Sequence, residues 1–202
     1  MSTLKKENLV KLYVSGKSMF EISVILNCSV HKITYWMDKH KIKRRKISEA
    51  MYLKLNPKGD PFKIVEVFDS EKNFLRGLGI GIYWGEGQKT TNNAIRVANT
   101  DAGMIRNFRR FLLEICGLEE RKIFYSIVCF KDSDVENVKA HWSKELGINP
   151  DKFGKIVRIP KQGKGTYKRK SEFGVCTITV SNPKLKLWIM NQIKDLGNAW
   201  IV

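Results

Sequence analysis

The residue best placed to do chemistry in this sequence is Glu86, which follows a glycine-rich apolar stretch. Gly77, Gly81 and Gly85 recur every four residues, so in a helix they share one face. A glycine costs up to about 1 kcal/mol relative to alanine in a helix interior, so three on one face require a packing reason. Such a face allows a second helix to approach backbone to backbone, and the stretch is too short for this packing to be a membrane contact.

If the second helix is the same segment of another copy, two Glu86 carboxylates meet at the negative ends of two helix dipoles. This arrangement is unfavourable unless a divalent cation lies between or beside the carboxylates. Carboxylate oxygens, water and phosphate are the ligands that Mg²⁺ prefers. The spacing therefore predicts a close helix pair with a cation near its acidic ends.

Other reactive constellations are not found in the sequence, which has no Ser-His-Asp arrangement, P-loop or zinc-ligand spacing. The four cysteines are scattered among apolar neighbours, which predicts buried, reduced thiols in a cytoplasmic protein rather than disulfides. The longest apolar stretch, Gly77 to Trp84, is far below the roughly 20 residues of a spanning helix, and the chain start lacks a signal-peptide pattern. We therefore expect no membrane segment.

Charge indicates the class of partner. The 202 residues include 37 Lys and Arg against 20 Asp and Glu, a net charge of +17 that attracts polyanions. Six of the eight positions from Lys39 to Lys46 are basic, and Lys152 to Lys170 contains eight basic residues and no acidic one. Two such runs favour nucleic acid over an anionic membrane surface, and over merely solvated faces.

The elements that position these residues begin with three short helices in residues 3–45. Ser18 and Glu21 form a capping box, and Ser29 caps the third helix after a break at Asn27-Cys28. Two short helices with a tight turn between them are typical of a helix-turn-helix. The alternative is a generic three-helix bundle.

In the third helix, Val30, Ile33 and Met37 recur at helical spacing and are predicted to face the core, with Ile22, Ile25 and Leu26 of the second helix. The outward positions are then candidates for contacts in a DNA groove: His31, Lys32, Thr34 and Tyr35. A basic tail follows, suited to phosphates or a minor groove, and its candidates are Lys39, Lys41, Lys43, Arg44, Arg45 and Lys46.

Residues 49–72 read as a linker, because Asn56 to Pro61 should interrupt regular structure. Beyond it we expect a helix to Gly85, a short hairpin around Asn92-Asn93 and a helix over 101–116. A strand at 123–130, a helix capped by Ser133, strands at 154–159 and 174–180 and a closing helix ending at Gly197 complete the pattern. A long loop between the last two strands holds five basic candidates for nucleic-acid contacts: Lys161, Lys164, Lys168, Arg169 and Lys170.

Two resemblances add to this interpretation. The first 48 residues resemble the helix-turn-helix of resolvases, transposases and related site-specific DNA proteins, in Gly16-Lys17-Ser18, Glu21-Ile22, Cys28-Ser29-Val30 and Trp36. The stretch Gly79 to Gly87 is similar to the motif helix of LAGLIDADG homing endonucleases. Trp84 departs from that motif, and the helix around 135–146 is an extra element relative to the family core.

The second resemblance implies an activity. It implies that Glu86 is the metal ligand and catalytic centre for Mg²⁺-dependent phosphodiester cleavage, and that Lys89 lies near the scissile phosphate or contacts the DNA backbone. One motif per chain implies a homodimer through Gly77, Gly81 and Gly85. The implied fold class is α+β, with a helix-turn-helix module (1–48), a linker (49–72) and a LAGLIDADG-like saddle domain with a mostly antiparallel sheet (73–202).

Two functions follow as hypotheses. The first is a site-specific endonuclease of double-stranded DNA that acts as a homodimer in the cytoplasm, associated with the nucleoid. The second is a catalytically silent DNA-binding regulator that keeps the same fold as a binding saddle, favoured by Trp84 and the extra helix. RNA binding and a recombination accessory role remain open at this point.

Overall fold

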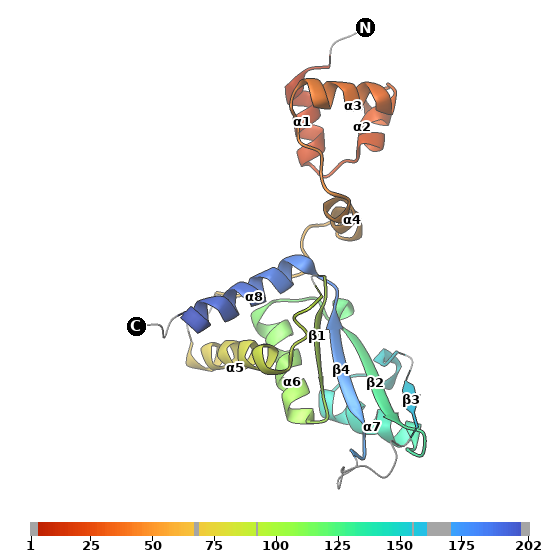
Figure 1. Cartoon of the computed structure of the whole chain (residues 1–202), viewed down its shortest axis with the longest axis vertical. Helices are drawn as coiled ribbons and strands as arrows, with labels where there is room; N and C mark the ends of the chain where they lie inside the picture. Colours follow the sequence, from red (N-terminus) through yellow and green to blue (C-terminus); the bar gives the residue numbers. More distant parts are fainter. Residues whose placement is uncertain (1–3, 67–68, 92, 155, 161–170, 199–202) are drawn as a thin grey trace. The chain divides into compact units, whose positions relative to one another are not determined.

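The chain divides into two compact units, Met1–Asp60 and Pro61–Val202 (Figure 1). The computed structural model describes residues 4–66, 69–91, 93–154, 156–160 and 171–198. Each unit has its own hydrophobic core. The combination of helices with one four-stranded sheet confirms the α+β class, and the division falls inside the predicted linker 49–72.

The first unit is helical. Its helices are α1 (Lys6–Val14), α2 (Met19–Ile25), α3 (Val30–Lys39) and α4 (Ile47–Leu55). The first three match the helices predicted in residues 3–45, and Leu9, Ile22, Ile33 and Met37 are almost completely buried between them. Ile25 and Val30 were expected to face the core, but both are exposed, because they lie at the ends of α2 and α3, beyond the edge of this small core.

Local hydrogen bonds fix both the start of α2 and the short turn between α2 and α3. Ser18 accepts a hydrogen bond from the Glu21 N–H at 3.1 Å and donates its own N–H to Glu21 at 2.8 Å, which confirms the capping box. Asn27 adopts the left-handed conformation (φ 46°) that turns the chain, and Ser29 accepts from the Lys32 N–H at 3.2 Å. Four residues therefore separate the end of α2 from the start of α3.

Helix α4 lies in the segment that the sequence predicted as a linker. It begins where the Lys46 N–H donates to Glu49 at 3.0 Å, and it ends at Asn56. Tyr52 is its buried residue and donates a hydrogen bond to Asp60 at 2.8 Å, whereas Ile47, Met51 and Leu55 are exposed. The helix was missed because its apolar residues do not form a buried stripe.

The second unit combines four long helices with the sheet. The helices are α5 (Ser70–Glu86), α6 (Ala102–Arg110, continued by a π-helical turn over Phe111–Ile115), α7 (Val135–Leu146) and α8 (Pro183–Asn198). The strands are β1 (Ile95–Asn99), β2 (Phe124–Phe130), β3 (Val157–Ile159) and β4 (Val175–Val180). Their order is β1-β4-β2-β3, with two antiparallel pairs and one parallel pair, β2 with β3, so the sheet is mostly antiparallel as predicted.

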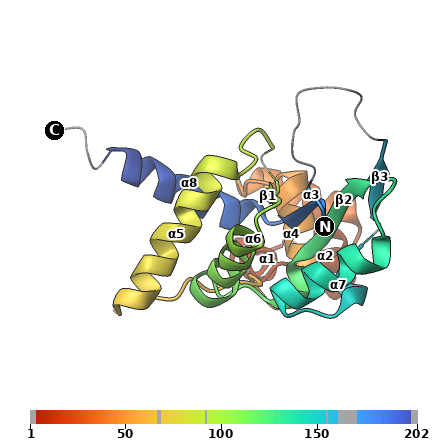
Figure 2. The same cartoon turned by 90° about the horizontal axis from the view of Figure 1, so that it is seen from below.

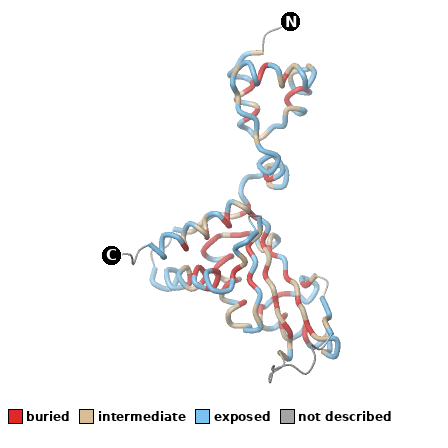
Figure 3. Tube along the Cα trace, viewed as in Figure 1, coloured by how far each residue is buried: buried red, intermediate tan, exposed pale blue. Residues whose placement is uncertain are grey.

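The sheet has one covered and one uncovered face. Helices α6 and α7 lie against one face (Figure 2), where alternate residues of β1, β2 and β4 are buried (Figure 3). The other alternate residues form what we call the open face, over which no helix of the described part of this unit lies. The open face consists of Arg96, Ala98, Phe124, Ser126, Val128, Phe130, Val157, Ile159, Val175, Thr177 and Thr179.

Two local expectations differ from the structure, and a third agrees with it. Gly87 pairs antiparallel with Val97 of β1, and the Gln88 N–H donates to the Arg96 carbonyl at 2.9 Å, as expected for a short hairpin around Asn92-Asn93; Asn92 lies outside the described residues. Helix α7 is capped by Asp134, not Ser133, because the Asp134 carboxylate accepts from two backbone N–H groups. α8 continues through Gly197.

Three of the four cysteines are buried as predicted, whereas Cys28 is half-buried. Cys116, Cys129 and Cys176 are buried free thiols, and burial raises the pKa of Cys176 to about 12. Within the described ranges, no helix combines the length and apolar character needed to cross a lipid bilayer.

The close contact between α5 and the π-helical turn sets the rotation of α5. Gly79 is buried there, and a Cβ atom at this position would overlap the Phe111 ring. Tyr83, Phe108, Phe111 and Trp188 continue this contact as a row of packed rings with centroid separations of 6.0, 5.9 and 6.5 Å. Only glycine at position 79 permits this approach.

We predict that Gly79→Ala lowers the free energy of unfolding by about 1–3 kcal/mol, because the added methyl group overpacks the core against Phe111. Urea denaturation followed by circular dichroism measures the change. Gly16→Ala does not serve as a control, because Gly16 has a positive φ that alanine rarely adopts. The control is Lys72→Arg, a conservative substitution at an exposed position of α5. Equal stability of Gly79→Ala and the unmodified chain would contradict the packing described.

Candidate nucleic-acid interface

One stripe of α3 presents aromatic and basic side chains to solvent. His31, Tyr35 and Lys39 lie four residues apart and are all exposed, Tyr35 at 58%. The opposite side of the helix is buried through Ile33 and Met37. Since residues four apart lie on one side of a helix, the three exposed side chains form a continuous stripe.

Two other predicted groove-facing residues lie beside this stripe. Lys32 and Thr34 are half-buried, and the Thr34 hydroxyl donates a hydrogen bond to the Val30 carbonyl at 3.0 Å. A hydroxyl that bonds the preceding turn of its own helix is less available to a ligand. The stripe of His31, Tyr35 and Lys39 is therefore the principal outward surface of α3.

The carboxy-terminal end of α3 is held by ring contacts. The Lys39 ammonium lies 4.6 Å from the centroid of the Trp36 ring and 5.8 Å from that of Tyr35. His40 stacks on Trp36 and its Nε2 is 2.9 Å from the Leu4 carbonyl oxygen. These contacts fix the direction in which the basic tail leaves the helix.

The basic tail begins with a Schellman turn. Lys41 takes the left-handed conformation (φ 55°), its N–H donates to the Asp38 carbonyl at 3.0 Å, and the Ile42 N–H donates to the Met37 carbonyl at 2.8 Å. Ile42 packs on the core of the first unit. Lys41 is thus directed into solvent at a defined position.

Arg45 has a structural role that its sequence context did not indicate. Its backbone N–H donates to the Tyr13 hydroxyl at 2.7 Å, and its guanidinium lies 3.9 Å over the Tyr13 ring. The guanidinium also donates to the carbonyls of Tyr13 and Lys17. Its donors are therefore engaged within the unit, and the tail residues left exposed are Lys41, Lys43, Arg44 and Lys46. Arg44 makes only a weak, exposed contact of 3.8 Å with Asp38.

The residues of the second predicted basic cluster lie outside the described residues: Lys161, Lys164, Lys168, Arg169 and Lys170.

Glu86 is the last residue of α5, and its carboxylate is exposed. Among the residues that the structure describes, it has neither a hydrogen-bond nor an ion-pair partner. Gly87 follows in extended conformation and is buried, and a Cβ there would overlap the Tyr83 carbonyl, which accepts the Gly87 N–H at 2.9 Å. Glycine at position 87 is thus required to end the helix where it does. Lys89 is exposed two residues further on.

The predicted glycine face of α5 is uncovered. Gly77, Gly81 and Gly85 are exposed, and a Cβ atom at any of them would meet no described atom within 4 Å. Two aromatic residues lie on the same side of the helix, Phe74 at 70% and Trp84 at 48% exposure. The contacts of this chain therefore explain Gly79 and Gly87 but give no reason for the other three glycines.

A buried lysine holds the segment after α5. Lys186 of α8 is 4% exposed, and its ammonium donates to the carbonyls of Gln88 at 3.0 Å, Ala94 at 3.0 Å and Thr91. Burial lowers the pKa of this amine. Three carbonyls match the three donors of an ammonium group, so Lys186 fixes the segment that carries Lys89. The sequence signal for this role is the helical spacing of Lys186 with Ile189 and Ile193, which places the lysine on the apolar side of α8.

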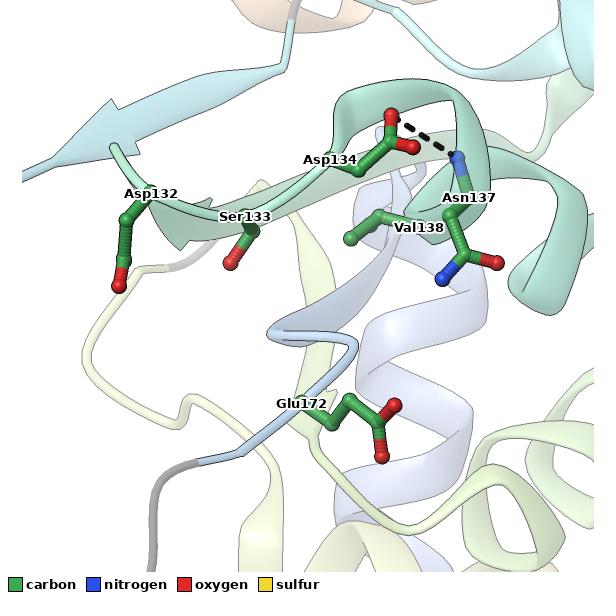
Figure 4. Close-up of a pocket in the computed structure, with 6 residues that line it drawn as sticks. All are labelled: Asp132, Ser133, Asp134, Asn137, Val138 and Glu172. Carbon is green, nitrogen blue, oxygen red and sulfur yellow. Dashed lines mark hydrogen bonds between the residues drawn. The ribbon is translucent and has the colours of Figure 1, made fainter.

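An acidic pocket of about 340 Å³ was not predicted. It lies at the start of α7 (Figure 4), and its lining residues are Asp132, Ser133, Asp134, Asn137, Val138 and Glu172. Asp134 serves as the helix cap there. In the described part of the chain, no group of three or more His, Cys, Asp or Glu side chains is placed to hold a metal ion, and a negative pocket repels a polyanion.

We predict two effects of Lys186→Met, because three carbonyls lose a charged donor. Hydrogen exchange of the backbone amides in the segment 88–94 should become faster, and the free energy of unfolding should fall by on the order of 3 kcal/mol. Hydrogen–deuterium exchange of the backbone amides, read by mass spectrometry, measures the first effect. Lys194→Met, on an exposed position of the same helix, is the control. Unchanged exchange across 88–94 in Lys186→Met would show that the ammonium does not order this segment.

Comparison with known proteins assigns no family to the chain. No family model, curated protein or solved structure matches it. The function is therefore inferred from the residues and their geometry alone.

Proposed function

We propose that the chain binds double-stranded DNA at specific sequences, with α2 and α3 acting as a helix-turn-helix and α3 as its recognition helix. The observation that carries the proposal is the exposed stripe of His31, Tyr35 and Lys39 on the helix that follows the tight turn. Side chains of this kind on a recognition helix contact base edges in the major groove.

Charge supports the same proposal. The first unit carries 13 Lys and Arg against 5 Asp and Glu, and the exposed tail residues Lys41, Lys43 and Lys46 follow α3 directly. Contacts of such residues with phosphates give affinity that does not depend on sequence and falls with salt. Anchoring by Arg45 orders the tail in advance, which reduces the entropy lost on binding.

We predict that Tyr35→Ala and Lys43→Gln weaken DNA binding in different ways. Tyr35→Ala should reduce discrimination between the preferred site and random duplex by about 1–3 kcal/mol, since it removes a contact with base edges. Lys43→Gln should weaken binding to all duplexes and reduce the slope of log K against log salt by roughly 0.9, the contribution of one phosphate. Sites selected from a randomised duplex library and fluorescence anisotropy at several salt concentrations measure both.

The control for both variants is Lys194→Gln, an exposed lysine of the second unit. Equal losses at specific and random duplexes for Tyr35→Ala would exclude α3 as the reading element. Absence of any duplex binding by the unmodified chain would exclude the proposal as a whole.

For the second unit we propose a LAGLIDADG-like fold. Support comes from the glycine-faced helix that ends at Glu86-Gly87 and from the mostly antiparallel sheet with one uncovered face. The chief difference from a helix–two strands–helix–two strands arrangement is α7, which connects β2 to β3 and makes that pair parallel, as a helical crossover does.

A second candidate activity is Mg²⁺-dependent DNA cleavage by a homodimer. It is favoured by the uncovered faces of Gly77, Gly81 and Gly85 and by the unpartnered carboxylate of Glu86 on the same helix. Among the residues that the structure describes, Glu86 belongs to no group of three or more His, Cys, Asp or Glu side chains placed to hold a metal ion. The candidate therefore requires a second copy of α5, and Mg²⁺ would supply charge stabilisation at a phosphate only in that dimer.

We predict that, if the chain cleaves DNA, Glu86→Gln lowers the cleavage rate at least about 100-fold. Duplex affinity should be unchanged, because the substitution removes one charge at a position outside the binding surface of α3. Incubation of each variant with the selected duplex and Mg²⁺, with products resolved on a denaturing gel, measures this. Glu7→Gln, at an exposed position of α1, is the matched control.

The alternative function is a catalytically silent regulator. It predicts tight, salt-dependent duplex binding that is indifferent to Mg²⁺ and to Glu86→Gln. Analytical ultracentrifugation of the unmodified chain and of Gly81→Leu further distinguishes the nuclease from the silent regulator. If both chains are monomers, the glycine-face dimer is excluded, and cleavage at Glu86 is excluded with it.

A further inference from the structure

The open face of the sheet has a chemistry that differs from the rest of this basic protein. Its central positions carry short side chains: Ala98 on β1, Thr177 on β4 and Ser126 on β2 lie in one row across three strands. Reading base edges inside a duplex groove requires long polar side chains. A planar group can instead lie directly on a surface of short side chains.

An exposed aromatic ring lies on this face. Phe124, at the start of β2, is 55% exposed. Its Cζ atom is 2.5 Å from where a Cβ of Gly154 would stand, so glycine at 154 allows the ring to lie against the neighbouring backbone. The Gly154 N–H donates to the Tyr125 carbonyl at 3.0 Å, which holds that backbone in place. The ring is thus supported on one side and open to solvent on the other.

A positively charged side chain, Arg96, lies in the same row of the sheet as the Phe124 ring. Thr179 of β4 pairs with Arg96 on one side and with Phe124 on the other. Two strand spacings separate Arg96 from Phe124, which is about 10 Å. Arg96 is exposed, and its guanidinium has neither a hydrogen-bond nor an ion-pair partner among the described residues.

Proteins bind unpaired nucleotides by stacking the base on an aromatic ring and by contacting the phosphate with polar and charged groups. The open face offers hydroxyl groups, one exposed ring and one guanidinium without a partner among the described residues. The net charge of +17 favours such a polyanion over a neutral ligand. We propose that the open face binds single-stranded DNA, with a base stacked on Phe124 and a phosphate at Arg96. This goes beyond duplex recognition by α3 and does not depend on it.

The test uses the full chain and a fluorescein-labelled oligothymidylate of about 20 nucleotides, long enough to cross one binding surface. Phe124→Ala should weaken binding roughly 10- to 100-fold, the loss expected for one stacked base, and Phe124→Tyr should stay within about twofold. Arg96→Gln should reduce the salt slope by about 0.7, the contribution of one phosphate on a single strand. Phe20→Ala, at an exposed phenylalanine of the first unit, should leave the affinity for the single strand unchanged.

A stacking signature comes from a 2-aminopurine base in the oligonucleotide, whose fluorescence should be quenched by the unmodified chain and recover with Phe124→Ala. The proposal is overturned if the chain does not bind the single strand, if Phe124→Ala binds it unchanged, or if oligouridylate binds more tightly than oligothymidylate. Duplex binding that responds to Tyr35→Ala would survive each of these outcomes, so the two proposals fail separately.

Discussion

The fit of Gly79 against Phe111 is the contact on which the second unit depends. Because the α5 backbone touches the Phe111 ring there, the helix has one possible rotation, extended by the packed rings of Tyr83, Phe108 and Trp188. That rotation directs the three remaining glycines of the helix interior to solvent. It also brings Gly87 beneath the Tyr83 carbonyl, where the helix must stop, so the position of Glu86 follows from aromatic packing in the core.

The first unit differs from the second in that it holds many like charges close together. Its small core orders three helices, and ring contacts at Trp36 and Tyr13 hold Lys39 at the end of α3 and Arg45 in the tail. The Arg45 guanidinium keeps its charge but donates to backbone carbonyls of the same unit. The repulsion among the neighbouring basic residues is tolerated because they are exposed and screened by solvent and salt.

Most elements could be predicted from the sequence where local signals agreed. The capping box at Ser18, the helical spacing of α3 and the helix expected over 101–116 rest on local signals, and each appears in the structure. Helix α4 was missed because its apolar residues face solvent, and the parallel pairing of β2 with β3 was missed because register depends on contacts distant in the chain. The roles of Arg45, Phe124 and Lys186 likewise arise from neighbours more than 25 residues away.

Lys186 makes one region of the protein electrostatically unlike the others. Exposed lysines lose their long-range influence in physiological salt, where the screening length is about 8 Å. Counter-ions cannot surround an ammonium group that is 4% exposed and enclosed by three carbonyl oxygens. The contact of Lys186 with the segment between α5 and β1 should therefore persist at ionic strengths that neutralise the attraction of the remaining surface.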